Sequence, residues 1–302
     1  MKKKYNKIWR NTGKYNTCLP PNLPSEKIVT KDSKVCAMGS CFADEMGWWL
    51  RSNGVNVGDH GEVDELQHLL YRWGTFFNPK NLSDCLDRVI NDGWEIEDKN
   101  FAYIEKEDTY YNLFMKVRGN SNNLETVKQK LLDVENYWKN WLDQSDVIII
   151  TLGLIEAWID KSNGKAWQAF VGNVLSGKSY NDLADFKVLS YEECLKEVKK
   201  SIDLISNFGV DKKFIITLSP IPLEFTFRDQ DIVTANRISK STLRVVAEKV
   251  CEQYDNVYYF PSFEIVMDCV GPTAFKEDLR HVRPEVFSEI IAPQFLESFG
   301  DF

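Results

Sequence analysis

The sequence changes character within residues 34–44, which read Lys34-Val35-Cys36-Ala37-Met38-Gly39-Ser40-Cys41-Phe42-Ala43-Asp44. The apolar run that ends at Met38 is typical of a buried strand, and the spacing from Phe42 to about Asn53 predicts a helix. Gly39-Ser40 forms the tight turn between them. This places Ser40 at the carboxyl end of a strand, beside the N–H groups of a first helical turn, which can hold an anion. The same geometry serves acyl transfer, in which an oxyanion forms beside the attacking oxygen.

Serine is also a favoured N-cap of helices, and on spacing alone the cap is the stronger interpretation of Ser40. A second polar group changes that balance. Asp278-Leu279-Arg280-His281 places a carboxylate and an imidazole three residues apart, shortly before a predicted C-terminal helix. His281 is one of only three histidines in the chain, so a base for Ser40 has few alternatives.

Composition limits the classes of protein to consider. The chain has 302 residues, 43% of them hydrophobic, and a net charge of -8, which argues against non-specific binding to nucleic acid. The seven cysteines form no CxxC pair, so we expect reduced thiols and no metal site. Lys2-Lys3-Lys4 is not followed by an apolar stretch, and no apolar run is long enough to span a membrane. We therefore expect a cytoplasmic protein.

Strand-like and helix-like segments alternate along the chain. Buried strands are predicted over 34–38, 146–153, 213–220 and 257–262, and helices over 42–53, 63–73, 82–91, 124–142, 191–208, 232–254 and 284–298. This alternation predicts an α/β fold, a three-layer α/β/α sandwich with a mostly parallel sheet. We expect one domain with an irregular lead-in over 1–30 and insertions over about 93–118 and 159–188. In the first insertion aromatic residues are interleaved with acids and lysines, which predicts strands. The chain after Gly153 and the segment from 262 to Arg280 are predicted to be loops. Ligands of such sheets bind at the carboxyl ends of the strands, where Ser40, Gly153 and Ser219 fall.

Several motifs together resemble a known family. Gly39-Ser40-Cys41-Phe42-Ala43 spells the motif that names the GSCFA family, which is similar to the SGNH (GDSL-like) hydrolase superfamily. The resemblance covers roughly residues 30–295 and extends to further stretches in the same order: Gly74-Thr75-Phe76-Phe77-Asn78-Pro79, 151–158, 219–223 with Thr226-Phe227, Ser239-Lys240-Ser241, 259–264 and Asp278-x-x-His281.

The resemblance implies an SGNH-like, flavodoxin-like sandwich and assigns roles to four residues. Ser40 is the nucleophile and contributes its own N–H to the oxyanion hole, and Gly74 adds another N–H. His281 takes the proton of Ser40 and passes it to the leaving group, while Asp278 holds the imidazole in the required tautomer.

The sequence departs from the superfamily after Gly153. There the superfamily has Gly-x-Asn-Asp, whose asparagine completes the oxyanion hole, whereas this chain continues Leu154-Ile155-Glu156. Either Asn78 or an N–H group of a loop takes the place of that amide, or the oxyanion hole is weaker. Glu156 either orients a substrate hydroxyl or forms hydrogen bonds to the loops of the site.

These features favour a serine esterase or an O-acyltransferase that forms an acyl-enzyme, with a carbohydrate ester as the expected substrate by analogy. Hydrolysis needs no cofactor, whereas transfer needs an acyl donor such as acetyl-CoA. Two alternatives remain: a non-catalytic module that binds a glycan or a protein, and a thiol enzyme that uses Cys41.

Other residues have a structural and a functional interpretation. Trp158 and Trp167 either stack on sugar rings or anchor their loop, with the anchor favoured. Arg237, Lys240 and Arg244 either meet an anionic ligand or form a solvated helix face, and the solvated face is the interpretation we favour.

Overall fold

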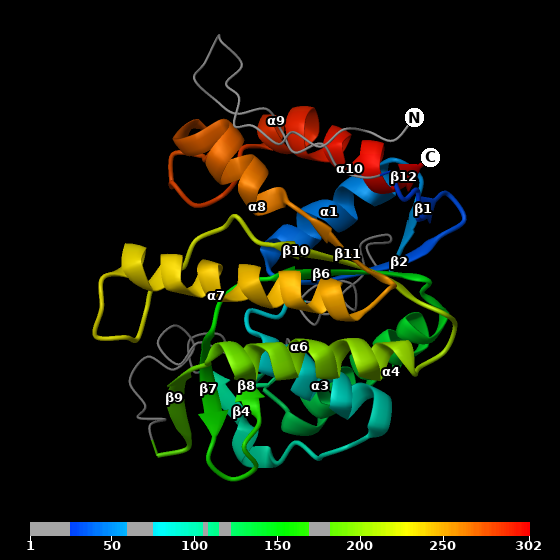
Figure 1. Cartoon of the computed structure of the whole chain (residues 1–302). Coiled ribbons are helices and arrows are strands. Elements are labelled where there is room, and N and C mark those ends of the chain that lie inside the picture. Colours follow the sequence, from blue (N-terminus) through cyan, green and yellow to red (C-terminus); the bar gives the residue numbers. More distant parts are fainter. Residues whose placement is uncertain (1–24, 59–74, 105–107, 115–121, 169–181) are drawn as a thin grey trace.

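The centre of the protein is a parallel sheet. The computed structural model describes residues 25–58, 75–104, 108–114, 122–168 and 182–302 (Figure 1). Its five-stranded sheet has the order β11-β10-β6-β2-β3 and consists of β2 (Lys34–Gly39), β3 (Asn56–Val57), β6 (Val147–Leu152), β10 (Lys213–Leu218) and β11 (Val257–Phe260). Numbered along the chain and read from the β3 edge, the order of these strands is 2-1-3-4-5, which is that of flavodoxin-like folds.

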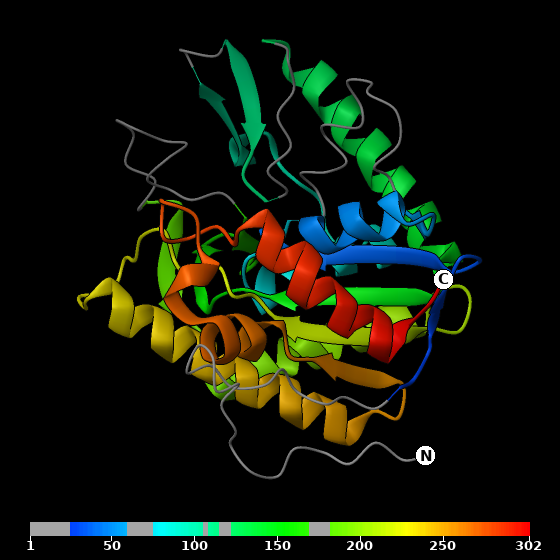
Figure 2. The same cartoon turned by 90° about the horizontal axis from the view of Figure 1, so that it is seen from above.

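Helices cover both faces of this sheet (Figures 1 and 2). One layer contains α1 (Cys41–Ser52), α8 (Ser262–Glu264), α9 (Pro284–Val286) and α10 (Ala292–Phe299), with the helical turns η3 (Ile265–Val270), η4 (Gly271–Ala274) and η5 (Phe287–Ile291). The other layer contains α3 (Pro79–Asn91), α4 (Leu124–Gln144), α6 (Tyr191–Ser206) and α7 (Ile232–Gln253). The predicted three-layer α/β/α sandwich with a mostly parallel sheet is confirmed.

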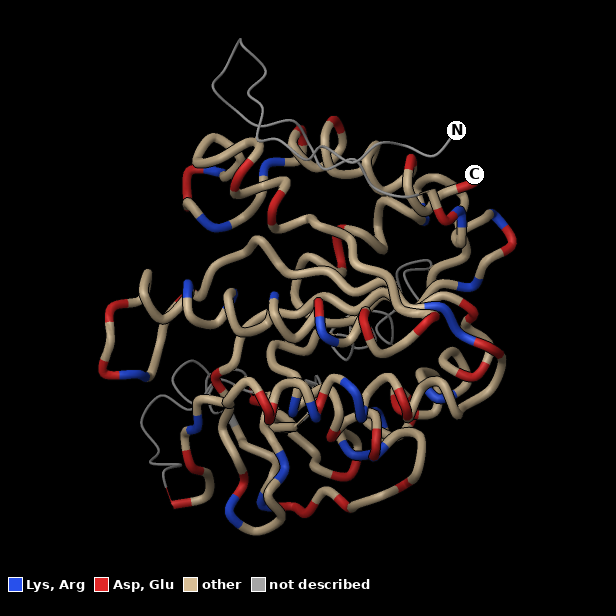
Figure 3. The backbone as a smooth tube through the Cα atoms, in the orientation of Figure 1, with Lys and Arg blue, Asp and Glu red and all other residues tan. Residues whose placement is uncertain are grey.

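The strands are apolar because they are buried on both faces. Alternate residues of β2 and β6 point into two separate cores: Cys36, Met38, Ile148 and Ile150 into one, and Val35, Ala37, Val147 and Ile149 into the other. All six residues of β6 are buried, as expected for a central parallel strand. Charged residues lie mostly outside the central sheet, whose five strands carry only Lys34 and Lys213, each at a strand's first position (Figure 3).

The two insertions form small antiparallel sheets. Residues 93–118 contain the turn η1 (Asp98–Asn100) and the hairpin of β4 (Phe101–Ile104) and β5 (Thr109–Asn112), which confirms the predicted strands. The sequence after Gly153 was predicted to be a loop, but β7 (Glu156–Asp160), β8 (Ala166–Trp167) and β9 (Ala184–Val188) form a three-stranded sheet there. The loop prediction fails because residues 156–160 obtain their partners from the far end of the insertion.

Near the chain ends, β1 (Val29–Thr30) pairs in parallel with β12 (Gly300–Asp301). The segment 262–280 was expected to be loop-like, yet its first half is helical. The predicted helix over 63–73 lies outside the described residues, as does most of the lead-in. Within the described ranges, no helix combines the length and apolarity that crossing a membrane requires.

Candidate active site

Ser40 is the residue at which β2 ends and α1 begins. Its backbone is extended, and its side chain caps α1, because the Phe42 N–H donates a hydrogen bond to Oγ at 3.3 Å. The Ser40 N–H donates to the Thr151 carbonyl oxygen on β6 at 3.0 Å. Gly39 has φ +124°, and a Cβ atom there would lie 2.2 Å from the same oxygen, so the turn requires glycine. Ser40 is therefore the N-cap of α1. Because its Oγ acts only as an acceptor in this bond, the hydroxyl proton is still available for donation.

This junction lies where the strand order reverses. β2 pairs with β3 on one side and with β6 on the other. The connection from β2 to β3 and the next one, from β3 to β6, therefore run in opposite directions across the sheet. Gly39 pairs with Thr151, which places Gly153, the residue directly after β6, at the same edge of the sheet as Ser40. Doubly wound sheets bind their ligands at the carboxyl ends of the strands at such a point.

The segment 75–78 closes this edge from the β3 side. The Phe76 N–H donates to the Gly39 carbonyl oxygen at 2.6 Å, and the Leu154 N–H donates to the Phe77 carbonyl oxygen at 2.8 Å. A Cβ atom on Gly153 would lie 2.7 Å from that Phe77 oxygen, so only glycine allows the two segments to approach this closely. The chain segments that carry the predicted site residues Ser40, Asn78 and Gly153 therefore meet.

The side chain of Asn78 is committed to the protein itself. Its Oδ1 accepts from the Asn81 N–H at 2.9 Å as the cap of α3, and its Nδ2 donates to the Glu156 carbonyl oxygen at 3.2 Å. Within the described part of the chain, the Gly153 N–H makes no hydrogen bond. Both substitutes considered for the missing amide thus keep an N–H: that of Gly153, and the second N–H of Asn78 Nδ2, of which only one is bonded to Glu156. Gly74 lies outside the described residues.

Glu156 holds the loop that follows β10. Its Oε1 accepts from the Thr226 hydroxyl at 2.6 Å and lies 3.0 Å from Arg228 Nε, and its Oε2 accepts from the Phe227 N–H at 3.2 Å. Both charged side chains are largely buried, at 7% and 9% exposure. Arg228 in turn donates to the Ser239 hydroxyl on α7 at 3.0 Å. The structure supports the second interpretation of Glu156, a residue bonded to the loops of the site.

Lys240 is buried, which corrects the interpretation of its helix face as solvated. Its ammonium donates to the Gly153 carbonyl oxygen at 2.8 Å and to the Ile221 carbonyl oxygen at 2.9 Å, and the residue is 3% exposed. The sequence contained a signal for this, because Lys240 precedes the buried Leu243 and Ala247 by three and seven residues and shares their side of α7. Sequence reasoning missed it because a charged side chain was taken as evidence of solvent.

Asp278 and His281 lie on a short hairpin between Phe275 and Val282, which form an antiparallel bridge. Asp278 Oδ2 lies 2.5 Å from His281 Nδ1, and Asp278 Oδ1 accepts from the Arg280 and His281 N–H groups at 2.9 and 3.0 Å. The hydrogen bond to His281, followed by those backbone bonds, holds the pKa of Asp278 well below its usual range. The pair therefore consists of an ionised carboxylate and an imidazole whose Nε2 is left to exchange a proton.

The hairpin of Asp278 and His281 and the turn at Ser40 form separate hydrogen-bonded units among the described residues. Within the described residues, no hydrogen bond joins His281 to Ser40, whose hydroxyl accepts only from the first turn of α1. The side chains of His281 and Asp278 remain 47% and 45% exposed. At the tip, Leu279 has φ +56° and is 72% exposed. The structure thus pairs the predicted acid and base, and it leaves the predicted nucleophile without a hydrogen bond to them.

The remaining candidates have structural roles or stay open. Trp167 is buried and donates to Asp160 Oδ2 at 3.0 Å, and Trp158 packs against Phe227 at 5.1 Å between ring centroids, so both anchor their strands. Cys41 follows Ser40 directly as the first residue of α1, with a thiol that forms no disulfide. Within the described ranges, no cluster of metal-ligating side chains occurs.

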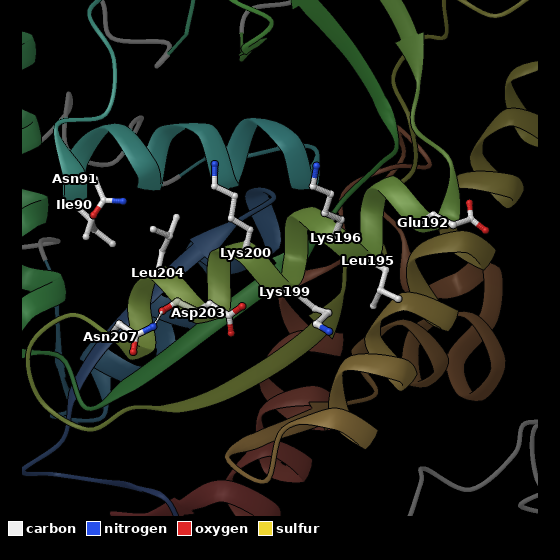
Figure 4. A pocket seen from close by; sticks show the side chains of 10 residues that line it. All are labelled: Ile90, Asn91, Glu192, Leu195, Lys196, Lys199, Lys200, Asp203, Leu204 and Asn207. Atoms are coloured by element: carbon white, nitrogen blue, oxygen red, sulfur yellow. Dashed lines mark hydrogen bonds between the residues drawn. The ribbon is translucent and has the colours of Figure 1, made fainter.

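One groove of the described surface lies away from this edge. It has a volume of about 820 Å³ and runs along α6, from Glu192 at the start of the helix to Asn207 just after its end, beside the end of α3 (Figure 4). None of the predicted site residues lines it. The groove therefore contributes nothing to the arrangement around Ser40.

Comparison with known proteins places the chain in a family. No curated protein matches it. The family model that matches is that of the GSCFA family, over residues 34–295, which include β2, the Ser40 turn and the hairpin of Asp278 and His281. This match spans most of the 302 residues. The chain therefore belongs to the GSCFA family.

Proposed function

We propose that the protein is a serine esterase or O-acyltransferase that works through Ser40, His281 and Asp278. The observation that carries the proposal is the position of Ser40, at the strand-order reversal of a doubly wound sheet and at the start of α1, in a chain whose Asp278 and His281 are already paired at 2.5 Å. A serine that was only a cap would need neither partner.

The reaction follows from the roles of these groups. His281 Nε2 removes the Ser40 proton as Oγ attacks the ester carbonyl, and Asp278 stabilises the imidazolium through Nδ1. The tetrahedral oxyanion is held by the Gly153 N–H and the start of α1, because the Ser40 N–H is engaged by Thr151. Collapse breaks the ester C–O bond, His281 protonates the departing alcohol, and an acyl-Ser40 remains.

A second oxygen nucleophile completes the cycle. Water releases the acid and makes the protein an esterase, whereas an acceptor hydroxyl takes the acyl group and makes it a transferase. The expected substrate is an O-acetyl ester of a carbohydrate. Hydrolysis needs no cofactor, and the transferase requires an acyl donor such as acetyl-CoA.

The hairpin must bring His281 to Ser40 during this reaction. Catalytic hydrogen bonds are often long in free enzymes and shorten only when substrate binds. The exposed position of His281 on a hairpin of eight residues, 275–282, leaves room for such a shift. If the shift does not occur, the protein is a binding module on the same scaffold, which is the outcome that the test must separate.

The test is the intact mass of the protein after incubation with a fluorophosphonate. We expect one adduct on the wild type, none on folded Ser40→Ala, and slow labelling of His281→Ala and Asp278→Asn. Cys41→Ala should label like the wild type. A wild type that stays unmodified while a known serine esterase labels would contradict the proposal and favour the binding module. Loss of labelling in Cys41→Ala with retention in Ser40→Ala would assign the thiol instead.

A further inference from the structure

The ammonium of Lys240 is buried between two strand ends. It lies on α7 and donates to one carbonyl oxygen after β6, that of Gly153 at 2.8 Å, and to one after β10, that of Ile221 at 2.9 Å. Within the described residues, no carboxylate forms an ion pair with it. Burying a charged group without a counter-ion lowers the free energy of unfolding. A role in the site therefore explains a lysine at position 240 better than a contribution to stability does.

The contact with Gly153 fixes the orientation of a peptide at the candidate site. The peptide between Gly153 and Leu154 is held at both ends, its oxygen by Lys240 and its N–H by the Phe77 carbonyl oxygen at 2.8 Å. That restraint sets the backbone of Gly153, whose own N–H makes no hydrogen bond in the described part of the chain. Besides the start of α1, the Gly153 N–H is thus a donor available to an oxyanion at this edge, and it is attached to a residue that Lys240 holds.

The charge of Lys240 adds an electrostatic effect to this restraint. In a site that excludes water, a fixed positive charge stabilises nearby negative charge far more than in solution. The side-chain amide that the superfamily resemblance implies after Gly153 is missing here, since Leu154-Ile155-Glu156 follow. The side chain of Asn78 is held in place by the Asn81 N–H and the Glu156 carbonyl oxygen, and the second N–H of its Nδ2 can add at most a neutral donor at this edge.

We propose that Lys240 is a positioning residue of the oxyanion-binding edge: it orients the Gly153 peptide and supplies, through Gly153, the positive potential that the missing amide would have given. The role rests on the proposed function, because it presupposes an oxyanion at Ser40.

The neighbourhood of Lys240 allows its charge to be titrated. Burial alone lowers the pKa of Lys240 to about 7. The other charged side chains on the elements packed against it are paired with other partners or act elsewhere: Glu156 with Arg228, Glu224 with Arg280, Arg244 with Glu248 and Glu264, and Arg237 towards Asp268. The charge at this position is therefore lost as the pH rises through about 7.

The experiment measures the rate of fluorophosphonate labelling between pH 6 and 9. Its proteins are the wild type, Lys240→Met, Lys240→Gln and, as a matched control on the same helix, Lys249→Met, whose lysine is 44% exposed. We expect the wild-type rate to decline above pH 7. Lys240→Met should label at least tenfold more slowly at pH 6 and show no such decline, and Lys249→Met should match the wild type.

The outcomes separate the two proposals. Labelling of Lys240→Met within twofold of the wild type, or a decline above pH 7 that persists in it, would overturn the positioning role while leaving the serine chemistry intact. Lower thermal stability with an unchanged pH profile would mean a structural role only. If Lys240→Met does not fold, Lys240→Gln, which keeps N–H donors without the charge, decides by the same criteria. A wild type that never labels contradicts the proposed function itself, and the positioning role with it.

Discussion

At the scale of single residues, the turn at Gly39-Ser40 carries the tightest constraints. The local sequence presented the N-cap and the nucleophile as alternative roles of Ser40, but the two are compatible. The hydroxyl oxygen accepts from the Phe42 N–H and still carries a proton that a base can remove. Gly39 makes the turn possible, since its carbonyl and its missing side chain both face neighbouring backbone.

Gly39→Ala should cost more stability than Gly54→Ala, measured by urea unfolding. Both glycines have positive φ, +124° and +84°, but a Cβ atom meets Thr151 O at 2.2 Å in the first and nothing within 4 Å in the second. We expect Gly54→Ala to cost about 1–2 kcal/mol from backbone strain alone. Gly39→Ala should add about 1–3 kcal/mol of overpacking. Equal costs would contradict the close approach of β2 and β6.

At the scale of elements, the loop between β10 and α7 is held at several points. Glu156 on β7 binds the loop at Thr226, Phe227 and Arg228, and Lys240 on α7 binds it at Ile221. These contacts join three elements at the carboxyl edge of the sheet, so the loop is expected to move only with them.

Glu156→Gln should destabilise the protein strongly, because it leaves the Arg228 charge buried at 9% exposure without a partner. Breaking a buried pair in this way costs about 3–5 kcal/mol. The control is Glu252→Gln, which removes the partner of Lys249 in a pair 44% and 54% exposed and should cost about 0–1 kcal/mol. Urea unfolding measures both, and hydrogen exchange at the Phe227 amide reports the loop. A loss in Glu156→Gln as small as that in Glu252→Gln would argue against the clamp.

At the scale of the whole molecule, the sheet separates two cores, and helices cover both. The strand order brings the ends of β2 and β6 together at one edge, and the second helical layer brings Lys240 to the same edge from α7. Because Lys240 is buried at that edge, its protonation changes the free energy of unfolding of the whole protein.

The free energy of unfolding should rise with pH above about 7, and this rise should be smaller in Lys240→Met. The pKa of Lys240 falls from 10.5 to about 7 on folding, so between these values the unfolded chain binds more protons than the native one. Stability therefore increases with pH in that window and is lost as the pH falls towards 7. Over pH 7 to 9 the difference amounts to about 2–3 kcal/mol, at about 1.4 kcal/mol per unit.

Urea unfolding of both proteins at pH 7, 8 and 9 measures this difference, and subtracting the two curves removes the contributions of all other groups. Parallel curves for the wild type and Lys240→Met would mean that the native lysine does not change its protonation in this window.

Much of the architecture followed from local patterns. Runs such as 146–153 and 213–220 identify buried parallel strands, and periodic apolar residues identify α1, α4, α6 and α7. These patterns are reliable because each lies within a short stretch of sequence. A strand buried on both faces needs consecutive apolar residues, and a helix buried on one face needs apolar residues at helical spacing. The position of Ser40 at the end of β2 follows from them as well.

The sequence by itself therefore determined the sandwich, the turn at Ser40 and the family motifs. Only the tertiary structure decided the partners of polar side chains: Glu156 with Arg228, Asn78 with the Glu156 carbonyl, and Lys240 with Gly153. The β7–β9 pairing likewise depended on it. The physical reason is that these partners are 24 to 87 residues apart, and a contact over such a separation exists only after independently formed elements have packed together.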